Sequence, residues 1–210
     1  MIDSINNSQS SEVCIVMLHG YGANKDDLFG LQVLFPETHV ISLQGPLDLS
    51  RMGMPGGRAW FNLEFTSSGI VYKEEEILAV LEALTEELES IKSRFKHVIL
   101  LGFSQGCILT HGLLLHNPEL ITAAICLSGR FSEKVFLEEL KRDVDDKPIF
   151  ISHGIYDEVI PIESGREIMA YYASSKAVVT SMEYEMGHEI SSPCVNDIQE
   201  WFQGLREKIL

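Results

Sequence analysis

One stretch of the sequence decides the fold: Val98-Ile99-Leu100-Leu101-Gly102-Phe103-Ser104-Gln105-Gly106-Cys107-Ile108-Leu109. Its first four residues form an apolar run with the length and composition of a strand that is buried on both faces. A second apolar segment, 107–115, has the length of a helix and ends at His116-Asn117-Pro118, where the proline stops it. The stretch therefore predicts a strand, a tight turn with Ser104 at its apex, and a helix.

A serine in such a turn has properties that suit a reacting group. Gly102 and Gly106 flank Ser104 at two positions on either side, leaving room for a crossing chain and for a substrate carbonyl group. The following helix presents its positive end near the serine, where negative charge on a reacting oxygen is stabilised. Gly-x-Ser-x-Gly alone is a weak signal because it recurs by chance, so the strand and helix around it carry more weight.

The chain has the size of one α/β domain. It contains 210 residues, of which 45% are hydrophobic, and we expect a single domain over 13–210. Residues 1–12 are polar and lack the features of a signal peptide, and we expect them to form a flexible N-terminal segment. A net charge of −15 argues against nucleic acid and anionic lipid as partners. No apolar run approaches the roughly 18 residues of a membrane span, so stable membrane insertion is not expected.

The cysteines follow no metal-binding or disulfide pattern along the sequence. They are widely spaced, without a C-x-x-C pair: Cys14, Cys107, Cys126 and Cys194. The first three lie in apolar runs, which predicts buried free thiols, a reducing compartment and hence a cytoplasmic protein. His111 and His116 are five positions apart on the predicted helix, so they do not share a face suited to one metal ion.

Strand-like and helix-like segments alternate along the chain. The predicted strands cover 13–18, 38–43, 98–101, 121–127, 148–152 and 178–184. The predicted helices cover 27–34, with Asn24 or Asp26 as its cap, and 73–94, 107–115, 132–140, 164–173 and 193–205. The clearest is 73–94, in which apolar residues recur at three- and four-residue steps. This alternation predicts an α/β fold with a mostly parallel central sheet, right-handed crossovers and helices on both faces.

The least regular segment, 44–70, is rich in glycine and proline but also carries many large apolar side chains. We expect it to form an irregular flap and wall over the sheet edge, with a short hairpin around 60–65. Its candidate substrate-binding residues are Met54, Trp60, Phe61 and Leu63. Trp60 and Phe61 could equally be plain core, since aromatic residues usually are.

Three further stretches lie where predicted strands end, which is where active residues gather in parallel sheets. They are His19-Gly20-Tyr21-Gly22, the stretch 152–161 with Asp157, and Met186-Gly187-His188-Glu189-Ile190. We therefore expect the hydroxyl of Ser104, the carboxylate of Asp157 and the imidazole of His188 to meet at one edge of the sheet.

Several of these residues also have structural interpretations. Asp157 could cap the turn that follows it, and Glu158 is a rival carboxylate that we expect to point to solvent. His19 and His153 each precede a glycine, and we expect both to brace loops by hydrogen bonds.

Taken together, the motifs resemble those of the carboxylesterase, acyl-protein thioesterase and lysophospholipase family of α/β-hydrolases. The resemblance rests on His19-Gly20-Tyr21-Gly22 with Asp26, Gly102-Phe103-Ser104-Gln105-Gly106, His153-Gly154 with Asp157 to Pro161, Gly187-His188, and the aromatic segment Arg58-Ala59-Trp60-Phe61. It covers nearly the whole chain from about residue 13 onwards and implies an α/β-hydrolase fold, whose catalytic residues follow the order Ser, Asp, His. The chain departs from the family at Tyr21, where relatives often have leucine, and this alters the lining of the pocket.

The resemblance and the chemistry of these side chains assign a role to each residue. Ser104 is the expected nucleophile, His188 the base that removes its proton, and Asp157 the carboxylate that orients the imidazole. The backbone N–H groups of Tyr21 and Gln105 are expected to form the oxyanion hole. Such a reaction needs no metal and no organic cofactor.

We therefore expect a serine hydrolase that cleaves carboxylic esters with short to medium acyl chains through an acyl-serine intermediate. An acyl-protein thioesterase or a lysophospholipase would use the same catalytic triad, Ser104, Asp157 and His188. The expected substrate is therefore a small ester or thioester, an acylated protein or a lysolipid. A non-catalytic protein that binds a small hydrophobic ligand on the same fold is the alternative of another class. The expected assembly is a monomer or a homodimer.

Overall fold

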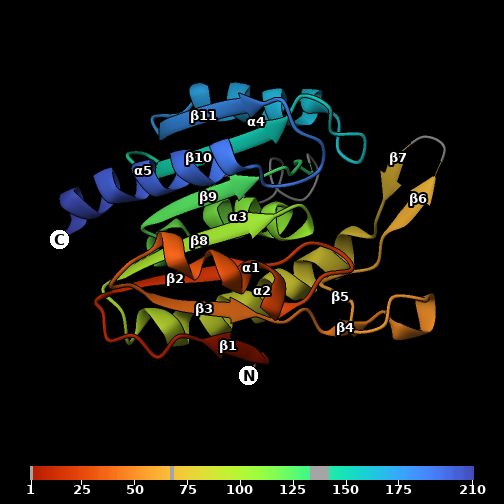
Figure 1. Cartoon of the computed structure of the whole chain (residues 1–210), viewed down its shortest axis with the longest axis horizontal. Helices are drawn as coiled ribbons and strands as arrows, with labels where there is room; N and C mark the ends of the chain where they lie inside the picture. The colour runs from red at the N-terminus through yellow and green to blue at the C-terminus, as the bar shows by residue number, and fades with distance from the viewer. Residues whose placement is uncertain (1, 67–68, 133–141) are drawn as a thin grey trace.

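The computed structural model describes residues 2–66, 69–132 and 142–210, and its centre is a seven-stranded sheet (Figure 1). The strand order is β1-β3-β2-β8-β9-β10-β11, and each neighbouring pair is parallel except β1 with β3. The strands are β1 (Ser4–Asn6), β2 (Val13–Leu18), β3 (His39–Leu43), β8 (His97–Phe103), β9 (Ala123–Leu127), β10 (Pro148–Gly154) and β11 (Val178–Tyr184). The mostly parallel sheet predicted from the alternation of segments is confirmed.

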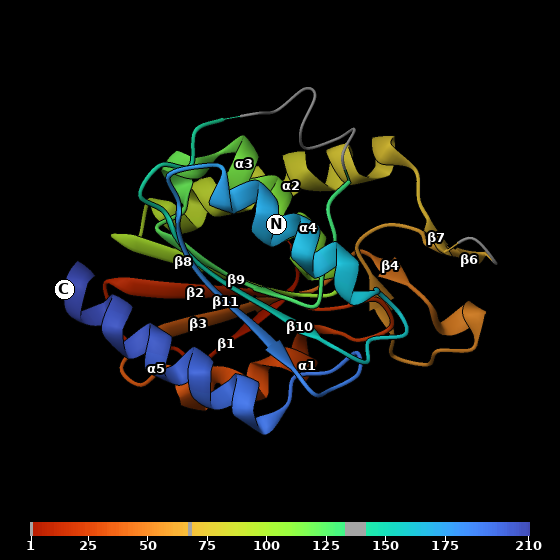
Figure 2. The ribbon, with the colours of Figure 1, turned by 90° about the horizontal axis from the view of Figure 1, so that it is seen from above.

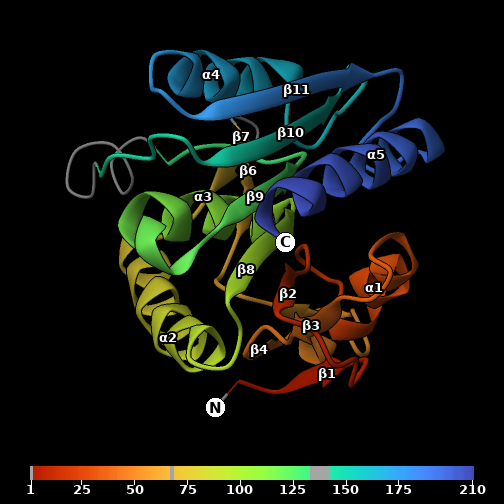
Figure 3. The same ribbon diagram turned by 90° about the vertical axis from the view of Figure 1, so that its left-hand side faces the viewer.

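Helices cover both faces of the sheet, as Figures 2 and 3 show. One face carries α2 (Glu74–Lys92), α3 (Gln105–His116) and α4 (Ile162–Ala173), and the other carries α1 (Lys25–Phe29) and α5 (Ser192–Ile209). The described ranges also contain three short 3₁₀ helices, η1 (Gly30–Leu34), η2 (Ser50–Met52) and η3 (Pro118–Leu120). A separate antiparallel pair is formed by β4 (Leu47–Asp48) and β5 (Arg58–Ala59). No helix in the described ranges is long and apolar enough to cross a membrane.

The central strands are apolar throughout because they divide their side chains between two cores. Every residue of β2 is fully buried, and alternate side chains enter opposite faces of the sheet. One face takes Cys14, Val16 and Leu18, and the other takes Val13, Ile15 and Met17. The predicted apolar stripe of α2 is buried against the first of these cores, at Ile77, Leu81, Leu84, Leu88 and Ile91.

The expectation of a flexible N-terminal segment is corrected at β1, an edge strand that runs antiparallel to β3. Backbone hydrogen bonds on either side extend this pairing, from Gln44 N–H to the oxygen of Asp3 (2.8 Å) and from Asn7 N–H to the oxygen of Val40 (3.2 Å). Because this contact uses backbone groups, a polar stretch of sequence can form it without any hydrophobic pattern.

Two other expectations need correction. The helix predicted over 27–34 is two short helices, α1 followed by η1, and it begins at Lys25 because the side chain of Asn24 accepts a hydrogen bond from Asp26 N–H (2.9 Å). The hairpin expected around 60–65 instead joins β6 (Glu64–Thr66) to β7 (Gly69–Val71), and it extends away from the sheet in Figure 1. The helix predicted over 132–140 lies outside the described residues, apart from Ser132.

Candidate active site

Ser104 occupies the sharp turn between β8 and α3 in a conformation that side-chain-bearing residues rarely adopt. Its backbone angles are φ 53° and ψ −113°, in the positive-φ region that favours glycine. The turn is held by a hydrogen bond from Ser104 N–H to the oxygen of Leu127 (3.0 Å). The backbone carbonyl oxygen of Ser104 accepts hydrogen bonds from Cys107 N–H (3.0 Å) and Ile108 N–H (3.1 Å), and these bonds begin the helix. The surrounding fold thus fixes the strained residue from both sides.

The glycines of the motif allow chain segments to cross at very short distances. A Cβ atom on Gly106 would lie 1.9 Å from the carbonyl oxygen of Leu18, on β2. A Cβ atom on Gly102 would lie 2.3 Å from the oxygen of Gly106. Since real contacts of this kind do not occur at such distances, only glycine allows α3 to pack this closely on the sheet.

The three predicted polar side chains meet at the carboxyl ends of β8, β10 and β11. The ring nitrogen Nε2 of His188 lies 2.8 Å from Ser104 Oγ, and Nδ1 lies 2.7 Å from Asp157 Oδ2. The ring of Phe103 packs beside the imidazole, with centroids 4.9 Å apart. The Asp157 side chain is fully buried, whereas that of His188 is 17% exposed, so the serine end of the chain of hydrogen bonds faces outward.

Asp157 caps its own loop with one carboxylate oxygen and contacts His188 with the other. Its Oδ1 accepts hydrogen bonds from the backbone N–H groups of Val159 (2.9 Å) and Ile160 (2.8 Å). Burial alone would raise the pKa of this carboxyl, but the hydrogen bond from His188 and those from the backbone outweigh it and lower the pKa. Asp157 therefore caps its loop and contacts His188 at the same time, and its carboxyl group stays ionised.

The two histidines that precede glycines brace loops, as the sequence predicted. His153 Nε2 donates to the backbone oxygen of Ile160 (2.8 Å) and lies 3.6 Å from Asp157 Oδ2. These two contacts hold the loop that carries Asp157 in place. His19 Nδ1 donates to the oxygen of Gly20 (2.8 Å), and its Nε2 accepts from Gly45 N–H (2.9 Å). Glu158, the rival carboxylate, is exposed.

The loop after β2 lies directly against the serine. A Cβ atom on Gly20 would be 3.3 Å from Ser104 Cβ and 3.2 Å from the ring of Phe103. Tyr21 follows in this loop, and Gln105 is the first residue of α3, so the two predicted oxyanion amides belong to segments on either side of Ser104. The loop is held in place by backbone bonds from Gly22 N–H to the oxygen of Arg58 (2.9 Å) and from Arg58 N–H to the oxygen of Ala23 (2.7 Å).

Sequence reasoning missed the buried side chain of Gln105, which ties the irregular segment to the serine turn. Its Oε1 accepts from the backbone N–H of Trp60 (2.9 Å), and its Nε2 donates to the oxygen of Phe61 (2.8 Å). The Trp60 indole N–H in turn donates to the oxygen of His19 (2.9 Å). No local sequence pattern signals these bonds, because they join positions more than 40 residues apart.

The four candidate substrate-binding residues occupy different environments. Trp60 and Phe61 are each 1% exposed and belong to the core on the α2 and α3 face, so the structure favours the core interpretation for both. Leu63 is partly buried and packs on the same core. Met54 is 39% exposed and lies beside the Tyr21 loop, since a Cβ atom on Gly22 would be 3.3 Å from its sulfur.

Met54 belongs to an exposed tip formed by residues 50–56. The base of the tip is closed by a hydrogen bond from Leu49 N–H to the oxygen of Gly57 (3.0 Å), and both of these residues are buried. Further large apolar side chains, outside the four candidate substrate-binding residues, are exposed in this tip and around Asp157: Met52, Ile155, Tyr156 and Val159. The tip beside the Tyr21 loop and the loop that carries Asp157 thus present apolar groups to solvent.

The hydrogen-bonded arrangement has a defined chemical capability. A serine hydroxyl bonded to a neutral imidazole loses its proton to that ring as the oxygen attacks an electrophilic carbon. The buried carboxylate fixes the tautomer in which Nδ1 carries the proton and stabilises the imidazolium that forms. A helix N-terminus beside the serine favours the developing negative charge.

Comparisons with known proteins agree with this architecture. A family model described as Phospholipase/Carboxylesterase matches residues 3–205. The Bacillus subtilis protein MhqD is 25% identical over 198 residues, 92% of this chain and 94% of MhqD. Acyl-protein thioesterase 1 of Saccharomyces cerevisiae is 31% identical over 145 residues, 67% of this chain but only 60% of the thioesterase. A crystal structure of a Bacillus cereus carboxylesterase matches with a TM-score of 0.84 and 20% identity, covering 97% of this chain and 94% of that one. The expected α/β-hydrolase fold is confirmed.

Proposed function

Because the chain belongs to the phospholipase/carboxylesterase family of hydrolases, we propose that it cleaves carboxylic esters through an acyl-serine intermediate. The observation that carries this proposal is the hydrogen-bonded chain from Ser104 Oγ through His188 to Asp157, with contacts of 2.8 Å and 2.7 Å. The non-catalytic alternative, a binder of a hydrophobic ligand, would have no use for this alignment.

In the proposed reaction, Ser104 Oγ attacks the substrate carbonyl carbon while His188 Nε2 takes the hydroxyl proton. The tetrahedral intermediate collapses, the bond to the leaving alcohol breaks, and His188 returns the proton to the departing oxygen. Water then attacks the acyl carbon while His188 takes a proton from it. The bond from that carbon to Ser104 Oγ breaks, His188 returns the proton to Oγ, and the acid is released. Each step uses groups of the chain and water, so the proposal includes no metal and no organic cofactor.

The amides of Tyr21 and Gln105 are the proposed oxyanion hole. Support comes from their segments, which contact Ser104 from two sides and are joined to one another through Trp60. A single donor of this kind typically lowers the barrier by about 3 kcal/mol.

The proposed substrates are small esters whose acyl part is apolar and of short to medium length. The exposed side chains of Met54, Ile155 and Val159 support this, because apolar groups on the loops around the triad favour an apolar acyl chain over a charged one. Leu63 remains a candidate for contact with the acyl chain; it is partly buried and packs on the core beneath the irregular segment 44–70.

Thioester hydrolysis is the second candidate activity, favoured by the 31% identity to the yeast acyl-protein thioesterase. The chain spans 60% of that relative, so an acylated protein as substrate is a proposal, as is the lysolipid that the family description suggests. We further propose a cytoplasmic location for a monomer or homodimer; the four free, buried thiols are compatible with a reducing compartment.

A fluorophosphonate probe tests the proposed mechanism, because it forms a covalent adduct only with an activated serine. We expect one adduct per chain, located at Ser104 by peptide mass spectrometry, and none in Ser104→Ala. The matched control is Ser128→Ala, which removes another buried serine with a positive φ. Absence of an adduct on the folded protein would favour the non-catalytic binder.

A substrate panel separates the candidate activities. We would compare kcat/KM for p-nitrophenyl esters of increasing chain length, an S-acyl thioester and a lysophospholipid with the same acyl group. The proposal expects a maximum at short to medium esters. A thioester or lysolipid turned over at least tenfold more efficiently than the matched ester would replace it with the corresponding alternative.

A further inference from the structure

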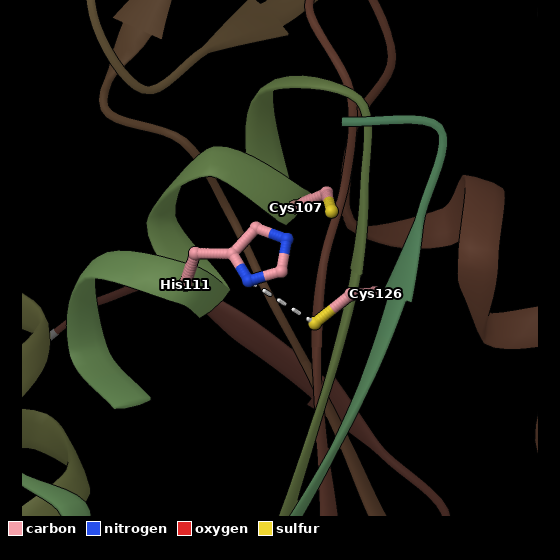
Figure 4. Close-up of side chains that lie close together, drawn as sticks. All are labelled: Cys107, His111 and Cys126. Atoms are coloured by element: carbon pink, nitrogen blue, oxygen red, sulfur yellow. Dashed lines mark hydrogen bonds between the residues drawn. The ribbon is translucent and has the colours of Figure 1, made fainter. Parts of the chain in front are cut away.

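A buried cluster of soft ligand atoms lies beneath the serine turn, away from the triad. It consists of Cys107 and His111, one helical turn apart on α3, and Cys126 on the adjacent strand β9 (Figure 4). One ligand atom from each residue lies within 4.8 Å of the other two, and Cys126 Sγ is 3.7 Å from His111 Nδ1. The sequence did not reveal this cluster because Cys126 reaches it through the pairing of β9 with β8.

The cluster is sealed from solvent by packed aromatic and backbone groups. The three side chains are at most 1% exposed. The His111 ring packs against Phe131, with centroids 4.9 Å apart, and against Tyr172 at 5.6 Å. A Cβ atom on Gly129 would lie only 2.3 Å from Cys107 Sγ, so the chain passes directly over this sulfur.

One nitrogen of the imidazole lacks a hydrogen-bond partner within the described residues. Nδ1 of His111 is 3.0 Å from the hydroxyl of Tyr172, whereas the fully buried Nε2 has no partner in the part of the chain that the structure describes. A buried polar atom without a partner is costly, so its retention calls for an explanation. In Figure 4 Nε2 lies on the side of the ring toward the sulfur of Cys107, whereas the dashed line joins Nδ1 to the sulfur of Cys126.

We propose that Cys107, His111 and Cys126 supply three of the four ligands of one bound Zn²⁺ ion, the fourth being a water molecule that enters with the ion. Two thiolates and an imidazole are ligands that zinc prefers, with bond lengths of about 2.3 Å to sulfur and about 2.0 Å to nitrogen. Tetrahedral bonds of these lengths separate ligand atoms by roughly 3.5–3.8 Å. The ligand atoms lie within 4.8 Å of one another, so they must approach by up to about 1 Å, and Cys126 Sγ, which contacts Nδ1, must turn toward Nε2. Nδ1–H then keeps Tyr172 as its acceptor, the usual arrangement for a zinc-bound histidine.

The charge of the site balances when zinc binds. Each cysteine thiol gives up its proton, two protons leave with solvent, and two thiolates neutralise the two positive charges of the ion. A neutral complex of this kind is compatible with a dry interior, where an unpaired charge is expensive. Because the cluster is sealed, we place zinc entry during folding, before α3 packs on β9.

The ion would connect the helix that begins at the serine turn to the neighbouring strand. Cys107 lies three residues after Ser104, and Cys126 pairs across the sheet with Gly102. Zinc here would therefore stabilise the base of the turn without contacting the reacting atoms, and its role is separate from the proposed ester hydrolysis.

Metal content provides the direct test. The chain would be expressed with added zinc, purified without chelators and measured by elemental mass spectrometry against protein concentration. We expect about one zinc per chain in the unaltered protein and at least a tenfold lower content in Cys107→Ser and Cys126→Ser. The matched control is Cys194→Ser, which removes a fully buried thiol on the other face of the sheet and should keep the metal.

A second measurement does not depend on variants that fold poorly. The unaltered protein would be denatured with chelator, freed of the chelator while still denatured, and refolded with equimolar Co²⁺. Bonds from Co²⁺ to thiolate produce a strong near-ultraviolet absorption band. The band should appear at about one cobalt per chain, and equimolar Zn²⁺ should remove it.

Three results would overturn the proposal. The first is zinc below a tenth of an equivalent both after expression and after refolding with zinc. The second is full zinc content in both cluster variants. The third is a count of two free thiols, instead of four, in the freshly denatured protein, because a Cys107–Cys126 disulfide would then occupy the cluster.

Discussion

The indole nitrogen of Trp60 donates a 2.9 Å hydrogen bond to the backbone oxygen of His19, which lies 41 positions earlier in the chain. The backbone N–H of Trp60 is bonded at the same time to the side chain of Gln105. One buried residue therefore joins the two segments whose amides we propose as the oxyanion hole. Its importance for catalysis would come from the placement of Tyr21 and Gln105, since the indole itself is only 1% exposed.

Replacing Trp60 with phenylalanine should lower kcat about tenfold while KM changes less than about twofold. The substitution keeps an aromatic ring in the core but leaves the oxygen of His19 without its donor, so the adjacent loop can shift. Because oxyanion donors act mainly in the transition state, the loss should fall on kcat. Steady-state kinetics with a p-nitrophenyl ester measures both constants.

Trp201→Phe is the matched control, because Trp201 lies on α5 and packs against Phe150 on the opposite face of the sheet. Its kcat should match that of the unaltered protein. Equal losses in the two variants would mean that general destabilisation, and not the bond to His19, explains the effect.

The proposed triad makes a quantitative prediction for its two ends. Ser104→Ala should reduce kcat by about 10⁶ and Asp157→Asn by about 10⁴, because asparagine stabilises the wrong tautomer of His188. Glu158→Gln, a change of an exposed carboxylate one position away, should leave kcat unchanged. Circular dichroism would verify folding, and near-normal turnover in either triad variant would refute the assignment.

Acidification should destabilise the fold through His19. Burial lowers the pKa of His19 from its ordinary value of 6.5, against smaller opposite effects of its bond to Gly20 and of Asp27. The unfolded chain therefore binds a proton at higher pH than the folded chain does, so stability is present above pH 6.5 and is lost as the pH falls below it. The physical event is protonation of Nε2, which breaks the bond from Gly45.

Denaturant titrations at several pH values between 7.5 and 5 would measure this loss, whose slope for one proton is at most about 1.4 kcal/mol per pH unit. His19→Gln should show a shallower dependence, because an amide oxygen accepts the Gly45 bond without titrating. Parallel curves for the two proteins would show that other groups cause the acid sensitivity.

Gly106→Ala should destabilise the protein by about 3 kcal/mol or more, since its Cβ atom would overlap the oxygen of Leu18 at 1.9 Å. Gly204→Ala is the opposite case, because a Cβ atom at this position of α5 meets nothing within 4 Å. It should stabilise the helix by roughly 0.5–1 kcal/mol. Thermal and chemical denaturation would compare the two, and similar effects would contradict the packing argument.

The sequence predicted those features that local chemistry determines. β2 and β8 were visible as apolar runs because parallel strands are buried on both faces, and α2 because its apolar residues recur with helical spacing. Ser104, Asp157 and His188 were candidates because each follows a predicted strand, and such strand ends meet at one edge of a parallel sheet. The structure brings these three side chains into hydrogen-bond contact.

Features that depend on distant contacts were not predictable in this way. β1 is polar and is held by backbone bonds to β3, so no side-chain pattern marks it. Trp60 and Phe61 could not be divided between core and pocket because their environment depends on Gln105, far along the chain. The meeting of Cys107 with Cys126 likewise follows from strand order, which residue spacing does not contain.

The exposed tip at residues 50–56 rises from a base that Leu49 and Gly57 close by a hydrogen bond, and the segment after it is anchored through Trp60. Gly53 and Gly56 have a positive φ that favours glycine, but mutations at the other five tip positions can accumulate without disturbing the buried framework that aligns the reacting groups. Sequence differences among related proteins should concentrate at these five positions, and a library randomised there is the direct way to change substrate selectivity.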